Sequence, residues 1–331
     1  DFTVLSYEKD LNWFRQQISD KFTVKFRGSI GPGIQDQKAI RILNRIVEWN
    51  VNGIWYEADQ RHAEILVHQL DLDSNKVRCD IPGEKLPYEE EDEELLPAHD
   101  VKRYQALVAR ANYLAQDRSD IQFAVKELCR SMSSPTRGSW KSLTKLGKYL
   151  KNHSRSGYQY AYQSQPDQLT VWTDTDYAGC KKTRKSTSGG VVLWGNHLIK
   201  SWSTTQSVVA LSSGEAEYYG MVKGASIALG LQSVLGDFRI TCGIEVKSDA
   251  SAAIGIANRR GLGKVRHIEV CQLWLQDKAR KGDIRITKVG TNENLADALT
   301  KFVSKEGIEA HMKGTCQTLT QGIHELAPNI E

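Results

Sequence analysis

The sequence predicts a mixed α/β sheet with flanking helices in its second half, preceded by a mainly helical first half. Apolar residues recur at helical spacing over residues 101–150, whereas short strand-like runs alternate with helical runs from residue 169 onward. The 331 residues suffice for about two domains. With 40% hydrophobic and 25% charged residues, the composition is that of an ordinary globular protein, which excludes collagen-like and largely disordered classes.

The first 71 residues contain signals for two helices and two strands. Apolar spacing predicts a helix over 10–20, and strands are expected at 40–49 and 53–57 around a turn at 50–53. Asp59 is a suitable N-cap for the next helix. The apolar face predicted for that helix consists of Ala63, Leu66, Val67 and Leu70.

An acidic run separates this part from the next helices. Residues 84–94 hold seven acids and one lysine, a net charge of −6, so the rest of a chain whose total is +4 carries +10. We expect a solvated linker over 72–100. The basic remainder favours an anionic partner such as nucleic acid.

Three helices are predicted between residues 101 and 150. The first presents an apolar stripe of Tyr104, Leu107, Val108, Ala111, Leu114 and Ala115. A capping-box pattern at 119–122 predicts a second helix that runs to Met132 and ends before Pro135. Ser139 is expected to cap a third helix through residue 150. The polar face of this helix, expected to be solvated, carries Lys141, Lys145 and Lys148.

The second half begins after a polar boundary expected at 153–168. Three strands are predicted at 169–173, 190–194 and 198–203. Ser212 and Glu215 form a capping box that opens a helix to about residue 235. The remaining predictions are a strand at 244–248, helices at 249–257 and 270–281, a strand at 283–289 and a last capped helix at 294–302.

Four acids are predicted at the ends of these elements. Asp174 and Asp249 follow strands, Glu217 lies in the first turns of the long helix, and Asp297 lies in the first turn of the last helix. Such acids can converge as oxygen ligands of two divalent cations, because Mg²⁺ prefers carboxylate oxygens. Each acid could instead be a helix cap, and Asp176 competes with Asp174 for the first position.

The remaining composition restricts cofactors and compartment. The six cysteines contain no C-x-x-C pair, which argues against a zinc or redox site and suits a reducing compartment. No apolar run approaches the ~20 residues that span a bilayer, so no membrane partner is expected. The chain opens without Met or a leader, and we expect it to be a fragment of a longer protein.

Seven sequence blocks occur in a recognisable order in the second half. They are TDTDYAG at 173–179, RKSTSGG at 184–190, KSWS at 200–203, QSVVALSSGEAEY at 206–218, SDASAA at 248–253, RHIE at 266–269 and NLADALTK at 294–301. Together, over residues 169–303, they resemble the ribonuclease H domain of copia-type LTR retrotransposon polyproteins. Residues 104–121 and 140–151 are similar to the segment that follows the polymerase palm, and Asp1 resembles the last aspartate of the polymerase motif.

This resemblance implies Mg²⁺-dependent endonucleolytic hydrolysis of the RNA strand of RNA–DNA hybrids. Two Mg²⁺ ions, or Mn²⁺ as a substitute, would be held by Asp174, Glu217, Asp249 and Asp297. The resemblance selects Glu217 over Glu215 and places His267 near the scissile phosphate. Phosphate and 2′-hydroxyl contacts are expected from Arg184, Lys185, Ser186, Thr187, Ser188, Arg259, Arg260 and Arg266.

The resemblance also implies a division of the chain. We expect the end of the palm and start of the thumb at 1–71, the acidic linker at 72–100, a helical thumb or connection at 101–160, ribonuclease H at 169–303 and a tail at 304–331. The implied partners are an RNA–DNA hybrid and the missing upstream palm and fingers. Polymerase activity is not expected, and the implied location is intracellular, in the cytoplasm or a virus-like particle.

Two alternatives remain open at this point. The chain could be a catalytically inactive remnant that binds nucleic acid without cleaving it. An integrase or transposase would use a related sheet and two metals, but its glutamate comes last in the order of acids, whereas Glu217 comes second.

Overall fold

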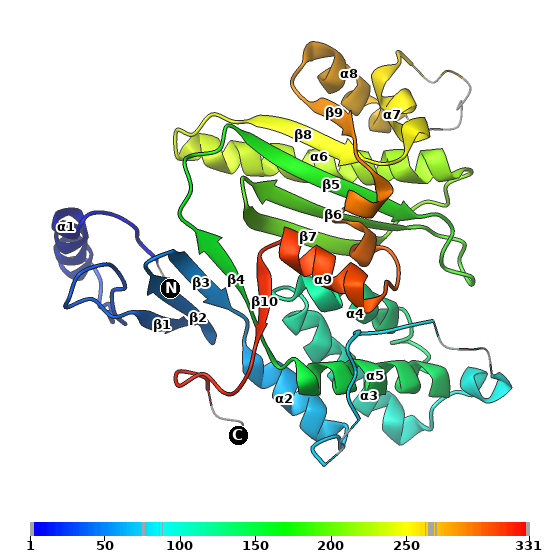
Figure 1. The fold of residues 1–331 in the computed structure, drawn as a ribbon, viewed down its shortest axis with the longest axis horizontal. Coiled ribbons are helices and arrows are strands. Elements are labelled where there is room, and N and C mark those ends of the chain that lie inside the picture. Colours follow the sequence, from blue (N-terminus) through cyan, green and yellow to red (C-terminus); the bar gives the residue numbers. More distant parts are fainter. Residues whose placement is uncertain are drawn as a thin grey trace.

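The computed structural model describes residues 3–74, 77–85, 87, 89–261, 263, 268 and 270–328. Within this part of the chain, two five-stranded sheets lie in separate lobes, and a bundle of helices lies below both (Figure 1). The second sheet is mixed and carries helices on its face. This confirms the predicted fold class of the second half, while the first half contains a sheet as well as helices.

The first sheet is antiparallel and has the order β1-β2-β3-β4-β10. Helix α1 (Glu8–Ser19) precedes it, and the strands are β1 (Ala39–Ile42), β2 (Arg45–Asn50), β3 (Gly53–Glu57), β4 (Arg155–Ala161) and β10 (Gln317–Thr320). The prediction of a single strand at 40–49 is wrong. Leu43 and Asn44 adopt left-handed φ angles of 49° and 65° and turn the chain into a hairpin of β1 and β2. The polar stretch expected as a boundary at 153–168 contains β4 instead.

The helical bundle consists of α2 (Gln60–Gln69), α3 (Ala98–Leu114), α4 (Gln122–Cys129) and α5 (Arg137–Asn152). Asp59 caps α2 as predicted, since its carboxylate accepts a hydrogen bond from the Arg61 amide. The apolar faces predicted for α2 and α3 are buried in one common core. Local spacing therefore identified the packing surfaces of these two helices correctly.

Two helix starts differ from the prediction. Ser119 caps no helix: it lies in a 3₁₀ turn (Ser119–Ile121), and its hydroxyl donates to Gln317 Oε1 at 2.8 Å. Helix α4 follows this turn and ends at Cys129, before the expected Met132. The N-cap of α5 is Thr136, and Ser139 closes the capping box three residues later.

The acidic run lies along α5. A 3₁₀ turn (Glu90–Glu93) orders part of it. The Lys141 ammonium lies 2.8 Å from Asp92 and 2.5 Å from Glu89, and Lys145 pairs with Glu84. Two of the three lysines expected on a solvated face therefore form ion pairs with the run expected as a solvated linker.

A buried ion pair, Arg118–Asp120, links the helical bundle to strand β10. Both side chains are fully buried and the shorter of their contacts is 2.6 Å. Tyr149 of α5 and Gln317 of β10 also donate hydrogen bonds to the Asp120 carboxylate. Because α5 and β10 come from distant parts of the sequence, this network fixes their relative position.

Asp120 makes the stability of the chain vary with pH in the acidic range. Burial raises the pKa of this carboxyl, but the charge of Arg118 and hydrogen bonds from Arg118, Gln317 and Tyr149 lower it to about 2. Because an unfolded aspartate titrates near pH 3.9, the ionised group stabilises the fold above pH 4, and this contribution disappears as the pH falls toward 2. We expect a loss of about 2 kcal/mol of unfolding free energy between pH 5 and pH 2.

Urea unfolding at several pH values measures this effect. Asp120→Asn carries no titrating group at this position, so its unfolding free energy should depend less steeply on pH below 4 than that of the wild type. Equal slopes in the two proteins would contradict the assignment.

The second sheet has the order β7-β6-β5-β8-β9. Its strands are β5 (Gln168–Asp176), β6 (Thr187–Trp194), β7 (His197–Thr205), β8 (Gly243–Ser248) and β9 (Arg285–Lys288). Strands β5, β6 and β7 pair antiparallel, whereas β8 and β9 run parallel to β5. Helices α6 (Ser213–Asp237), α7 (Ser251–Asn258) and α8 (Trp274–Lys281) follow β7 and β8, with a 3₁₀ turn (Val270–Gln272) before α8.

The chain after β9 returns to the first sheet. The prediction of a capped helix at 294–302 is wrong, because this stretch holds only the 3₁₀ turn η5 (Asp297–Leu299), and a second 3₁₀ turn, η4 (Thr291–Glu293), comes just before it. Helix α9 (Lys305–Gly314) and β10 follow, and β10 pairs with β4.

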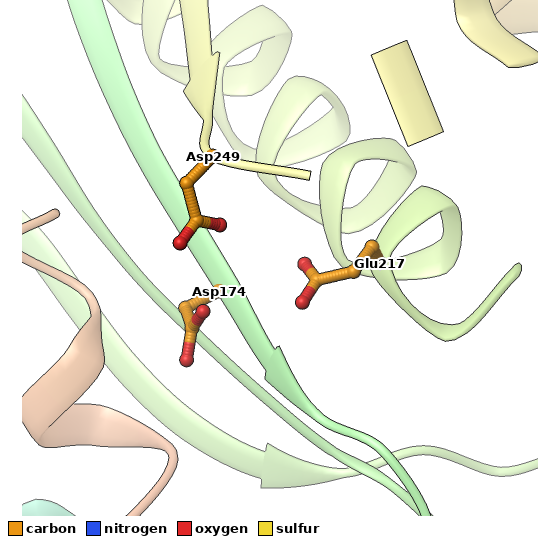
Figure 2. Close-up of side chains that lie close together, drawn as sticks. All are labelled: Asp174, Glu217 and Asp249. Carbon is orange, nitrogen blue, oxygen red and sulfur yellow. The ribbon is translucent and has the colours of Figure 1, made fainter. Parts of the chain in front are cut away.

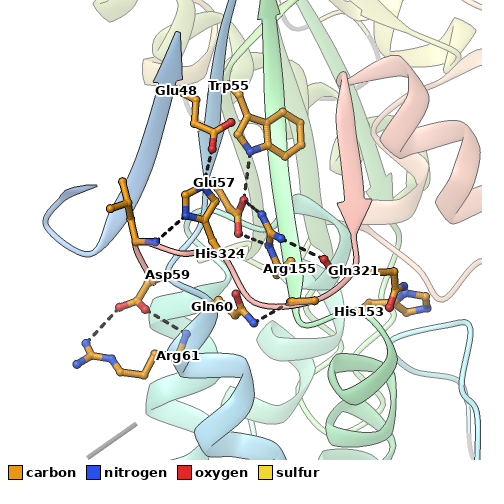
Figure 3. A network of polar contacts seen from close by, with 12 residues as sticks. Glu48, Trp55, Glu57, Asp59, Gln60, Arg61, His153, Arg155, Gln321 and His324 are labelled. Carbon is orange, nitrogen blue, oxygen red and sulfur yellow. Dashed lines mark hydrogen bonds and ion pairs between the residues drawn. The ribbon is translucent and has the colours of Figure 1, made fainter. Parts of the chain in front are cut away.

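The last described residues lie against β2 and β4. Arg155 of β4 forms two 2.8 Å contacts with Glu57 and donates to the Gln321 carbonyl, while His324 contacts Glu48 (Figure 3). In the part of the chain that the structure describes, every helix is too short or too polar to cross a lipid bilayer.

Candidate active site

Strands β5 and β8 bring two of the predicted acids to one edge of the second sheet. They are parallel neighbours, paired in register from Gln168 with Gly243 to Trp172 with Lys247. Asp174 lies near the carboxyl end of β5, and Asp249 directly follows β8. Parallel strands end at the same edge, so the topology places both carboxylates there.

Helix α6 brings Glu217 to the same edge because glycines let it lie close to the sheet. A Cβ atom on Gly220 would lie 2.6 Å from Thr175 Oγ1, and one on Gly224 would lie 2.7 Å from Thr173 Cγ2. Both distances are shorter than non-bonded contacts allow, so larger residues would push the helix away from β5. Ser212 caps α6 as predicted, through a hydrogen bond from the Glu215 amide.

Asp174, Glu217 and Asp249 point toward one another (Figure 2). One carboxylate oxygen from each residue lies within 4.8 Å of the corresponding oxygens of the other two. Burial raises the pKa of Glu217, and the charges of Asp174 and Asp249 raise it further, to about 9. Burial also raises the pKa of Asp174, to about 6, against the effect of a hydrogen bond from Thr300.

Asp297 lies beside this triad and is not one of its three converging acids. Its negative charge raises the pKa of Asp174, and η5, the turn that carries Asp297, packs against β5. One oxygen, Oδ2, forms a 2.8 Å ion pair with Lys301, while Oδ1 is buried and accepts no hydrogen bond. Lys301 ends the NLADALTK block but was not predicted as a site residue.

Glu215 and Glu217 have different environments on α6. The Glu215 carboxylate accepts hydrogen bonds from the Leu211 amide at 2.9 Å and the Tyr219 hydroxyl at 2.8 Å. Glu217 instead points toward Asp174 and Asp249, and its Oε2 is buried without a hydrogen-bond partner. The geometry therefore assigns Glu215 to the start of the helix and Glu217 to the acidic cluster.

The predicted nucleic-acid contacts fall into three groups. Arg184 and Arg260 are exposed, while Lys185 and Arg259 are half-buried. Arg266 and His267 lie outside the described residues. Ser186, Thr187 and Ser188 are buried, and the contacts expected between their hydroxyls and a nucleic acid stay a prediction.

The three buried hydroxyls bond within the protein. Ser186 Oγ accepts from the Ala178 amide, and Ser188 Oγ accepts from Gln206. Thr187 Oγ1 accepts from Lys126 of α4 and from Arg130, the residue directly after this helix. These contacts close the 177–186 loop and join α4 to the sheet. Local sequence does not predict this role, because Lys126 and Arg130 lie about 60 residues before Thr187.

The residues present fit a divalent metal site. Carboxylate oxygens are the ligands that Mg²⁺ and Mn²⁺ prefer. The buried Oε2 of Glu217 and Oδ1 of Asp297 accept no hydrogen bond from the protein, which leaves these oxygens available to a cation. Three acids so close repel one another strongly unless they share protons or a cation.

Comparison with known proteins relates the chain to transposon polyproteins. No family model matches it. It is 30% identical over 213 residues to the retrovirus-related Pol polyprotein from transposon RE1 of Arabidopsis thaliana, a match that covers 63% of this chain. It is 28% identical over 198 residues, or 58% of this chain, to the corresponding polyprotein from transposon TNT 1-94 of Nicotiana tabacum. The chain spans about 14% of the length of each of these relatives.

Among solved structures, the chain is similar to the N-terminal ribonuclease H domain of rv2228c from Mycobacterium tuberculosis, solved as a fusion with maltose binding protein. The TM-score is 0.31 and the sequence identity is 19%, and the match covers 45% of this chain and 98% of that one.

Proposed function

We propose that the second lobe is a metal-dependent ribonuclease H, because the chain is similar to retrovirus-related Pol polyproteins of copia-type transposons. The proposed reaction is endonucleolytic hydrolysis of the RNA strand of an RNA–DNA hybrid, which leaves a 5′-phosphate and a 3′-hydroxyl. The convergence of Asp174, Glu217 and Asp249 from three separate elements is the observation that carries the proposal.

The proposed cofactors are two Mg²⁺ ions, with Mn²⁺ as a substitute, and the proposed ligands are Asp174, Glu217, Asp249 and Asp297. Such ions supply activation of a water nucleophile and stabilisation of negative charge on the phosphate. The protein contributes rigid placement, because Asp174 lies on β5, Asp249 directly follows the neighbouring strand β8, and Glu217 lies on a helix packed against β5. Lys301 holds Asp297 at the margin of the cluster.

The proposed substrate is recognised through its backbone. Arg184 is an exposed cation and Lys185 a half-buried one on the loop after β5, and phosphate contacts of this kind carry no sequence information. Hybrids also present 2′-hydroxyls across a shallow minor groove, which distinguishes them from DNA duplexes. His267 is proposed to lie near the scissile phosphate, and the upstream palm and fingers of the polyprotein are proposed as the partner segments that deliver the hybrid.

A cleavage assay with a hybrid labelled on both strands tests the proposal. We expect cleavage of the RNA strand alone in Mg²⁺ or Mn²⁺, and none after EDTA removes the metal. Asp249→Asn should abolish cleavage while still binding the hybrid. Metal-independent cleavage, or cleavage that survives Asp249→Asn, would refute the proposed site. Salt-sensitive binding by the wild type without cleavage would instead identify an inactive nucleic-acid-binding remnant.

A further inference from the structure

Thr300 is a buried residue that connects two of the proposed metal ligands. Its side chain is completely buried, and its hydroxyl donates a hydrogen bond to Oδ2 of Asp174. Its backbone amide donates to the Asp297 carbonyl at 3.2 Å. Thr300 therefore contacts the acid on β5 through its side chain and the acid on η5 through its main chain.

A glycine opposite Asp174 provides the space for this contact. Gly189 of β6 is the residue paired with Asp174 across the two antiparallel strands. A Cβ atom on Gly189 would lie 2.7 Å from Leu299 Cβ and 2.7 Å from Thr300 Cγ2. Any larger residue at 189 would displace η5 from the sheet, and Thr300 would then move away from Asp174.

An asparagine anchors the other end of the same segment to β5. The buried Asn294 side-chain amide donates to the carbonyl of Thr173, the residue before Asp174, at 3.0 Å. Its Oδ1 accepts from the Ala296 amide at 3.1 Å, which holds the chain that leads into η5. The segment from 294 to 300 is thus fixed to β5 on both sides of Asp297.

The Thr300 hydroxyl has two acceptors within reach and one hydrogen to donate. Besides Asp174 Oδ2, the Asp297 carbonyl lies 3.2 Å from Thr300 Oγ1. An ionised carboxylate is a stronger acceptor than a neutral carbonyl, so the hydrogen is directed to Asp174. This bond holds Oδ2 of Asp174 in place and thereby fixes the orientation of the whole carboxylate.

We propose that Thr300 is a positioning residue that orients the Asp174 carboxylate for metal binding, with Gly189 providing the space it occupies. The inference rests on the proposed function, because it assigns a role within the same site. Groups that hydrogen-bond to a metal ligand fix its orientation, and their loss typically weakens metal affinity by about 10- to 100-fold.

Calorimetric titration of the chain with Mn²⁺, without nucleic acid, tests this role. We expect Thr300→Val, which keeps the shape but removes the hydroxyl, to weaken Mn²⁺ binding by about 10-fold or more. Thr300→Ser restores the hydroxyl and should bind Mn²⁺ like the wild type. The Mg²⁺ concentration needed for half-maximal cleavage should rise in the valine variant in the same proportion.

Thr315→Val is the matched control. Thr315 is also completely buried, and its hydroxyl donates to the His311 carbonyl at 2.9 Å, in α9. The control removes an equivalent buried hydroxyl, so it should change the melting temperature in EDTA as Thr300→Val does but leave Mn²⁺ affinity unchanged. Equal Mn²⁺ affinity in Thr300→Val and the wild type, or equal losses in both valine variants, would overturn the positioning role.

The outcomes separate this inference from the proposed function. If the wild type cleaves hybrids but Thr300→Val binds Mn²⁺ normally, the positioning role fails and the ribonuclease H proposal stands. If the wild type cleaves no hybrid but loses Mn²⁺ affinity on Thr300→Val, the positioning role stands and the proposed reaction fails. A wild-type chain that binds no Mn²⁺ overturns both.

Discussion

Glu217→Gln is expected to lower the rate of hybrid cleavage by about 1,000-fold or more without destabilising the protein. The change removes the charge of a proposed metal ligand, and a loss of about 4 kcal/mol of transition-state stabilisation corresponds to this factor. In EDTA, burial and the neighbouring carboxylates raise the pKa of Glu217 to about 9, so the side chain is already neutral at pH 7 and a neutral glutamine of similar shape can replace it. We therefore expect a melting temperature in EDTA that is equal to or higher than that of the wild type.

Glu215→Gln, two residues earlier on the same helix, is the control. Both carboxylate oxygens of Glu215 accept hydrogen bonds at the start of α6, so the change affects a buried local contact. We expect a lower melting temperature with most of the cleavage activity retained at a temperature where the variant is folded. Loss of activity in Glu215→Gln with full activity in Glu217→Gln would reverse the assignment of the two acids.

Arg118→Met is expected to reduce the free energy of unfolding by about 3–5 kcal/mol, because it leaves the Asp120 carboxylate buried without its counter-ion. Both side chains of this pair are fully buried, and Asp120 also accepts hydrogen bonds from α5 and β10. Urea unfolding followed by circular dichroism measures the change. Loss of this pair should loosen the contact between the helical bundle and the first sheet.

An exposed ion pair provides the comparison for this effect. Arg137–Glu94 has a similar contact distance of 2.9 Å, but both side chains are more than half exposed. We expect Arg137→Met to change the free energy of unfolding by less than about 1 kcal/mol. The double variant Arg118→Met with Asp120→Leu should recover much of the lost stability, since it removes both buried charges. No recovery would indicate that hydrogen bonds, rather than charge, dominate this network.

Much of the second lobe could be predicted from local sequence. Its strands and long helix were located to within a few residues, and Ser212 was identified as the cap of α6. Capping and apolar periodicity depend on neighbours within about four residues, so the sequence contains them directly. The same reasoning identified the Asp59 cap and the buried stripe of α3.

The first lobe was predicted less well, because its elements depend on distant partners. Strand β4 was missed since its polar residues gain their strand structure by pairing with β3 and with β10, about 160 residues later. Ser119 has the pattern of a helix cap, yet its hydroxyl bonds to Gln317. The hairpin at Leu43 was missed because leucine seldom adopts a positive φ angle.

For the candidate site, the types of residues and their order are read directly from the sequence, and the resemblance of its blocks to copia-type polyproteins selects Asp174, Glu217, Asp249 and Asp297 from 40 acids. The convergence of the first three acids, the pairing of Asp297 with Lys301 and the contact of Thr300 with Asp174 are visible only in the folded chain. The folded chain also shows that Ser186, Thr187 and Ser188 are buried. The physical reason is that chemical identity and local conformation depend on neighbouring residues, whereas burial and side-chain contact depend on how strands and helices far apart in the chain pack together.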